Sequence, residues 1–120
     1  MSMGKRTYEL DEEDFGTLCI CALRYCQGRR TYMPSWVMEI VKPFLPVLSD
    51  KDIDIIVDDC ERQRKFDLYG DDLVDKPEWL VWEETVRAEQ RKRIEIANAH
   101  KASIYRKAMD ELERLQSKKQ

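Results

Sequence analysis

The sequence has few of the residues that build metal and catalytic sites. It contains one histidine, His100, and no Cys-x-x-Cys pair, so the ligand spacing of a zinc site is missing. It has no glycine-rich phosphate loop, no Gly-x-Ser-x-Gly motif, and no cysteine close to a histidine. These absences predict a chain that binds no metal or cofactor and is not an enzyme.

Long hydrophobic runs are also missing. No stretch approaches the roughly 18 apolar residues that a membrane span needs. The segment MSMGKRTYEL becomes acidic where the apolar part of a secretory signal would begin. The four cysteines are Cys19, Cys21, Cys26 and Cys60, and three of them share one helical pattern. We expect an intracellular protein with reduced, mostly buried thiols, the alternative being a disulfide from Cys60 to the first helix.

Composition and charge indicate one modest helical domain with an extension. Of 120 residues, 42% are apolar and 38% charged, which is enough for a single core. Through Trp82 there are 11 Lys or Arg and 17 Asp or Glu, whereas the remainder has 10 and 7. An acidic body with a mildly basic tail argues against a protein whose whole surface binds DNA.

Apolar residues recur at helical spacing along the first half of the chain. The sequence predicts a helix from about Asp11 to Gly28, a second capped by Thr31 or Ser35 and ended by Pro43 and Pro46, and a third capped by Ser49. Gly16, inside the first helix, is expected to mark a close helix crossing. The expected buried sides contain Phe15, Leu18, Cys19, Ala22, Leu23 and Cys26, then Trp36, Val37, Ile40 and Val41, then Ile53, Ile56, Val57 and Cys60.

A loop over residues 66–74 should lead into a long last helix. Asp75 and Glu78 have the spacing of a helix-capping box, and no glycine or proline follows Pro77. Four residues should close the core, namely Trp79, Leu80, Trp82 and Val86. The predicted fold class is all-α, a small bundle of three short helices plus a long C-terminal helix, with a core domain at 8–88 and a helical extension at 89–120.

Acidic residues of the third helix and the loop after it form one candidate binding surface. The segment from Asp50 to Glu61 matches several calcium-loop positions, but Ile55 stands where that loop needs glycine, so an amphipathic helix is the preferred interpretation. The acidic face expected to bind a partner is Asp50, Asp54, Asp58, Asp71 and Asp72. The simpler alternative is a solvated helix face followed by turn-forming aspartates.

Arginines near the first turn and in the last helix form a second candidate surface. They are Arg24, Arg29, Arg30, Arg87, Arg91 and Arg93. Such side chains bind phosphates and carboxylates through two parallel hydrogen bonds, which fits an anion or a nucleic-acid backbone. The alternatives are helix capping at the turn and ion pairs along the last helix, where Glu83 precedes Arg87 by one turn.

The end of the last helix carries a weak apolar stripe, Tyr105, Met109, Leu112 and Leu115. It either packs on the body or forms a self-association face, through which the chain would make a homodimer. Asn98 and Lys101 interrupt a strict heptad, which argues against a long stable coiled coil.

The strings ALRYCQGRRTYMPSWV, LPVLSDKDI, YGDD and PEW resemble a group of small proteins encoded by bacteriophages and prophages. The resemblance covers about residues 14–85 and centres on an LRYxxGRRTY-type motif, whereas the tail past Arg87 departs from the group. It supplies no catalytic residues. It implies a phage protein in the cytoplasm of a bacterial host, a setting in which small helical proteins often inhibit host defence or regulate transcription.

The leading expectation is therefore a non-enzymatic protein that binds a host protein stoichiometrically and inhibits a defence effector such as a CRISPR nuclease. Its acidic face would compete for a site that normally holds nucleic acid. One alternative is a nucleic-acid-binding regulator that uses Arg29, Arg30 and the basic part of the last helix. Another is a structural or assembly protein that oligomerises through its C-terminal helix.

Overall fold

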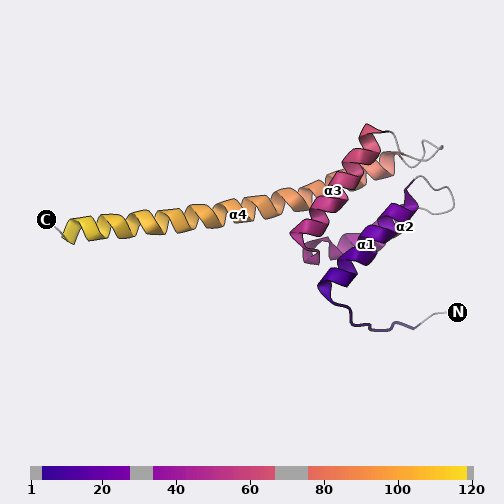
Figure 1. Cartoon of the computed structure of the whole chain (residues 1–120), viewed down its shortest axis with the longest axis horizontal. Coiled ribbons are helices and arrows are strands. Elements are labelled where there is room, and N and C mark those ends of the chain that lie inside the picture. The colour runs from indigo at the N-terminus through magenta and orange to yellow at the C-terminus, as the bar shows by residue number, and fades with distance from the viewer. Residues whose placement is uncertain (1–3, 28–33, 67–75, 119–120) are drawn as a thin grey trace. The chain divides into compact units, whose positions relative to one another are not determined.

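The computed structural model describes residues 4–27, 34–66 and 76–118. Within these ranges the chain forms four α-helices and one 3₁₀ helix and has no strand (Figure 1). The helices are α1 (Glu12–Cys26), α2 (Pro34–Val41), η1 (Lys42–Val47), α3 (Asp50–Lys65) and α4 (Lys76–Lys118). The predicted all-α fold, with three short helices and a long C-terminal one, is confirmed.

Side-chain caps set the beginnings of α1 and α3. Asp11 Oδ1 accepts a hydrogen bond of 2.8 Å from the backbone N–H of Asp14, and Ser49 Oγ accepts one of 3.1 Å from that of Asp52. The first turns of both helices are acidic, which suits the positive end of the helix dipole. The expected start of α1 at Asp11 and the Ser49 cap are confirmed, whereas Gly28 and Asp75 lie outside the described residues.

The second helix runs from Pro34 to Val41 and ends two residues before Pro43, the first of the two prolines predicted to end it. Ser35 lies inside this helix and not at its cap, and Thr31 lies outside the described residues. The chain then continues in the tighter turns of η1, in which Leu45 is buried and Leu48 follows as a second buried residue. Proline has no N–H to donate, so two prolines within six residues break the α-helical ladder here.

The chain divides into two compact units, residues 1–89 and 90–120. In the first unit, α1 packs against both α2 and α3, and the opening turns of α4 contribute Trp79, Trp82 and Val86 to the core. Among the described residues, fifteen buried apolar ones form the core: Cys19, Ile20, Leu23, Cys26, Met38, Val41, Leu45, Leu48, Ile53, Ile56, Val57, Cys60, Trp79, Trp82 and Val86.

Gly16 lies where α1 comes closest to the N-terminal end of α3. A Cβ atom at this position would overlap the carboxylate of Asp52 and lie 2.7 Å from its Cγ. The expected close crossing at Gly16 is therefore confirmed, and the absent Cβ leaves the space that the Asp52 carboxylate occupies.

Four residues predicted to be buried lie at the surface instead. Leu18, Trp36 and Ile40 are 55%, 64% and 52% exposed, and Leu80 is also exposed. The reason is that α2 has only two turns and buries a single stripe, Pro34, Met38 and Val41. Helical periodicity identifies which side of a helix faces inward, but not how much of that side its neighbours cover.

The second unit is helical throughout its described part, as the continuation of α4 to Lys118. All residues from Ile94 to Lys118 are exposed. None of the described helices has both the length and the hydropathy that crossing a membrane requires.

Candidate interaction surface

An apolar groove of about 240 Å³ opens between α1, α2 and η1. Phe15 and Phe44 meet edge to face in it, with ring centroids 5.0 Å apart. Leu18 and Ile40 line it with more than half of their surface exposed. The full lining, which we call the apolar groove, is Phe15, Leu18, Cys19, Ala22, Val37, Ile40, Val41 and Phe44.

Two more apolar side chains of these elements are exposed outside the lining of the groove. Trp36 lies one turn before Ile40 on α2, and Val47 lies at the end of η1, 62% exposed. Exposed apolar side chains gathered in a groove typically mark an interaction site. Large aromatic residues such as Trp36 are also the residue type that contributes most at protein interfaces.

An acidic cluster lies at the N-terminal end of α1, beside the groove. Its members are Asp11, Glu12, Glu13 and Asp14. Asp14 directly precedes Phe15, and Leu18 follows it by one helical turn. The negative charge of Asp11, slight burial, a hydrogen bond to Asp11 and the charge of Glu13 all raise the pKa of Asp14. Negative charge is thus concentrated at the edge of an apolar surface, where a cation would be stabilised.

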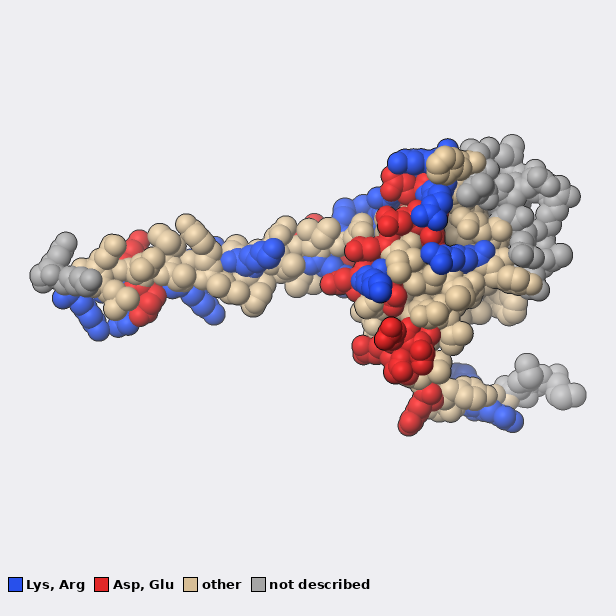
Figure 2. All heavy atoms as spheres, viewed as in Figure 1, with Lys and Arg blue, Asp and Glu red and all other residues tan. Residues whose placement is uncertain are grey.

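The predicted acidic face of α3 lies on another part of the first unit. Asp50, Asp54 and Asp58 are exposed and follow one another at four-residue steps, so they share one side of the helix. Figure 2 shows acidic side chains along α3 and at the beginning of α1, with basic ones among them. Asp71 and Asp72 lie outside the described residues.

A second groove, of about 620 Å³, runs between the N-terminal parts of α1 and α3. Its lining carries both signs of charge: Glu12, Glu13 and Asp52 are acidic, and Lys51 and Arg24 are basic. It therefore extends the acidic cluster toward α3, and a larger share of its lining is polar than in the apolar groove.

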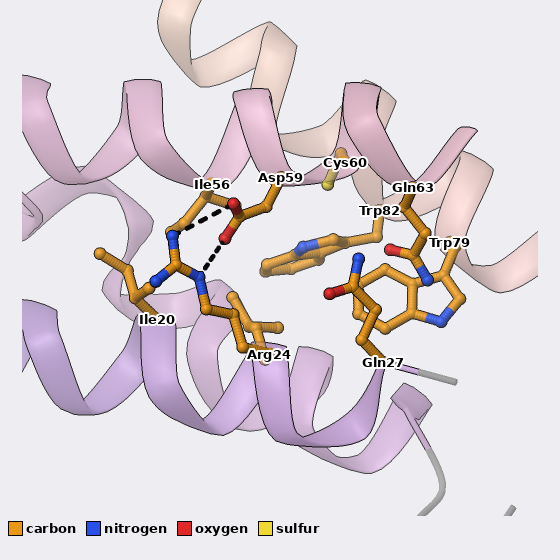
Figure 3. A pocket seen from close by; sticks show the side chains of 10 residues that line it. Ile20, Arg24, Gln27, Ile56, Asp59, Cys60, Gln63, Trp79 and Trp82 are labelled. Carbon is orange, nitrogen blue, oxygen red and sulfur yellow. Dashed lines mark hydrogen bonds and ion pairs between the residues drawn. The ribbon is translucent and has the colours of Figure 1, made fainter. Parts of the chain in front are cut away.

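Two of the six candidate anion-binding arginines form ion pairs with carboxylates of the same unit. Arg24 donates to Asp59 from Nε at 2.7 Å and from Nη2 at 3.2 Å (Figure 3). Arg87 donates from Nε to Glu83 at 2.8 Å. Hydrogen bonds to these carboxylates raise the pKa of both guanidinium groups.

The other candidate arginines belong to the second unit or to undescribed residues. Arg91 is exposed and Arg93 half-buried in the second unit, whereas Arg29 and Arg30 lie outside the described residues. Within the first unit, the two described candidates, Arg24 and Arg87, are both engaged in ion pairs with carboxylates.

Beside the Arg24–Asp59 pair, a small cleft contains two buried donors that lack partners. Among the described residues, neither Gln63 Nε2 nor Trp82 Nε1 has a hydrogen-bond acceptor. Gln63 is 1% exposed, and the side chains of Gln27, Cys60 and Trp79 also line the cleft (Figure 3). Its free volume is about 10 Å³, which matches one water molecule and is far too small for a substrate.

The burial of Gln63 is a feature that the sequence analysis missed. The residue lies among the charged side chains that end α3, although it continues the spacing of Ile53, Ile56 and Cys60. That spacing is the only sequence signal for its burial.

The cysteines do not form a reactive centre. All four are free thiols; Cys19, Cys26 and Cys60 are buried and Cys21 is exposed, as the preferred interpretation predicted. Burial raises the pKa of Cys60 to about 12, with smaller contributions from Glu83 and Asp59. This thiol therefore stays protonated at neutral pH. Among the described residues, no group of three or more His, Cys, Asp or Glu side chains is arranged to hold a metal ion.

The predicted self-association residues all lie in the second unit. Tyr105, Met109, Leu112 and Leu115 are exposed on its helix.

Comparison with protein-family models, curated proteins and solved structures finds no significant match to this chain. The surfaces of the two units are therefore the basis for assigning a function.

Proposed function

We propose that this chain is a non-enzymatic binding protein that acts stoichiometrically on another protein through the surface of its first unit. The observation that carries the proposal is the apolar groove, with Leu18 and Ile40 more than half exposed and the acidic cluster at its edge. Burying exposed apolar area is the main favourable term in protein association. The fold leaves this area open to a partner.

The chemistry of the surface indicates what the partner should present. Apolar side chains would enter the groove between Phe15, Leu18 and Ile40, and a Lys or Arg beside them would face Asp11 and Asp14. An amphipathic basic helix or loop combines these features. Charge complementarity would mainly set orientation and association rate, and apolar burial would supply most of the affinity.

The specific role that we propose is inhibition of a host defence effector, such as a CRISPR nuclease, in the cytoplasm of a bacterial host. Surfaces that hold nucleic acid are rich in Lys and Arg. Such a surface would be complementary to the acidic cluster and to Asp50, Asp54 and Asp58 on α3. The resemblance to phage-encoded proteins, centred on the LRYxxGRRTY-type motif, supports this choice of partner.

Affinity capture from bacterial host lysate, with and without nuclease, tests the proposal. The wild type should recover a specific protein that stays bound after nuclease treatment, in a 1:1 complex once purified. The groove variant Leu18→Gln/Ile40→Gln should lose it. The control is Val81→Gln, which replaces an exposed apolar residue of α4 that does not line the groove. Recovery of no protein, or equal recovery by all three chains, would contradict the proposal.

Nucleic-acid binding is the second candidate, and the charge of the second unit favours it. Residues 90–120 contain nine Lys or Arg and four Asp or Glu. A contact through Arg91, Lys92 and Arg93 would show affinity for DNA or RNA that falls steeply with salt, because each neutralised phosphate releases counterions. Loss of binding in the Arg91→Ala/Arg93→Ala variant would support it, and no binding at about 50 mM salt would exclude it.

A further inference from the structure

The helix of the second unit presents apolar side chains that its own unit does not cover. Tyr105 is 69% exposed and Leu112 is 52% exposed, and Ile94, Ile104 and Leu115 are similarly open. Most of the stability of a helix in water comes from packing one apolar face, since backbone propensity alone is marginal at this length. A surface that covers this face would therefore stabilise the helix.

The spacing of this face fits a second helix. Steps of four and three residues alternate without a break through seven positions, which we call the seam: Ile94, Asn98, Lys101, Tyr105, Ala108, Leu112 and Leu115. The mean step of 3.5 residues is that of a left-handed pair of helices. Ile104 and Met109 flank the centre of the seam and widen its apolar part.

Charged residues on the seam side determine the direction of the second helix. Lys101 is a seam position, and Arg91 lies three residues before Ile94, on the same side of the helix. A parallel partner would place each of these two side chains against its own copy, where like charges repel. An antiparallel partner places each of them against an apolar residue of the partner instead.

We propose that the seam binds the seam of a second copy of this chain in antiparallel orientation. The register that pairs the seam from Arg91 to Leu115 with itself places Ile94 opposite Leu112 of the partner subunit. It also places Lys101 over the ring of the partner's Tyr105, a cation–π contact. Asn98 then faces Ala108 of the partner subunit, and this small side chain leaves space for the Asn98 amide to reach solvent. This association is independent of the binding function proposed for the first unit.

Engineered disulfides in the full chain test both association and direction. A Cys21→Ser background removes the one exposed native thiol. In it, the double variant Ile94→Cys/Leu112→Cys should form a covalent dimer on oxidation. Ile94→Cys alone should not, because the two copies of position 94 would be about 27 Å apart, far more than a disulfide spans. Cross-linking by Ile94→Cys alone would show a parallel pair and overturn the proposal.

The molecular mass in solution and the dimer dissociation constants of charge variants provide a second test. Light scattering should give twice the 14.3 kDa of one chain, and a monomer at about 100 μM would overturn the proposal. Tyr105→Lys should raise the dimer dissociation constant about tenfold, because it replaces both cation–π contacts by contacts between two lysines. Adding Lys101→Glu should restore the affinity, because each introduced lysine then faces a glutamate of the partner subunit. Circular dichroism checks that each variant keeps its helix. Failure of the double variant to recover, with helix content intact, would contradict the proposed register.

Discussion

The missing side chain of Gly16 sets how closely α1 approaches the beginning of α3. The carboxylate of Asp52 occupies the space that a Cβ at position 16 would need. Glycine in a helix interior is about 1 kcal/mol less favourable than alanine, so the fold accepts this cost for the close contact. The crossing was predictable from sequence because glycine is so unfavourable there, but its partner, Asp52, was not.

A double-mutant cycle at these two residues measures the contact. Gly16→Ala in the wild type should bring little or no stabilisation, because the new methyl group must displace the Asp52 carboxylate. In an Asp52→Ala background the same change should stabilise the fold by about 1 kcal/mol, the full helix-propensity gain. Urea unfolding of the four chains gives both values. Equal effects of Gly16→Ala in the two backgrounds would show that the residues do not interact.

The buried thiol of Cys60 predicts a loss of stability at alkaline pH. Burial raises its pKa from an ordinary 9.0 to about 12 in the folded chain. Between these values the unfolded chain ionises the thiol and the folded chain does not, so the free energy of unfolding falls as pH rises. The contribution of one thiol is at most about 1.4 kcal/mol per pH unit.

Denaturant unfolding between pH 9 and pH 12 checks this linkage. Burial raises the pKa of Cys19 and Cys26 in the same direction, so the wild type should lose stability steadily. The Cys60→Ala variant should show a shallower slope, even though its stability at neutral pH is lower because of the cavity. Parallel slopes for the two chains would mean that this thiol ionises equally well in the folded state.

At the level of elements, sequence predicted helix ends better than helix faces. The Asp11 and Ser49 caps and the stop before Pro43 depend on local chemistry, which a short stretch of sequence contains. Which apolar residues of α2 are covered depends on neighbours far away in sequence. Trp36 and Ile40 were therefore assigned to the core, and the apolar groove that Ile40 lines was not predicted. The acidic and basic charge patterns were predictable, because charge is read directly from composition.

Two neighbouring residues of α2 test which of its apolar side chains are covered by the core and which are exposed. Val41→Ala should destabilise the fold by about 2 kcal/mol, from lost apolar burial and the cavity that remains, because Val41 is 2% exposed. Ile40→Ala should cost less than about 0.5 kcal/mol, as expected for a surface position. Thermal or urea unfolding compares the two. A similar loss for Ile40→Ala would show that the groove is part of the core and not a free binding surface.

For the whole molecule, burial is confined to one of the two units. All fifteen buried apolar residues lie between Cys19 and Val86, and the described residues from Ile94 onward are all exposed. The first unit therefore has its own core. The second is a helix that carries charged side chains and the apolar residues of the seam. Each unit offers a different kind of surface, one suited to a basic amphipathic segment and one to another copy of the chain.

Truncation separates the contributions of the two units. A chain that ends at Glu89 keeps every buried apolar residue, so it should unfold cooperatively, with a midpoint within a few degrees of that of the full chain. Its mass should be that of a monomer under conditions in which the full chain is dimeric. Calorimetry and light scattering check the two expectations. A broad, non-cooperative transition would show that the first unit depends on residues beyond 89.

The distribution of the four thiols has a practical consequence. Only Cys21 is exposed, and it lines the groove between α1 and α3. A maleimide dye should therefore label the native chain at one known position, without any substitution. Fluorescence from that single probe would report when a captured protein covers the first unit, and at what concentration.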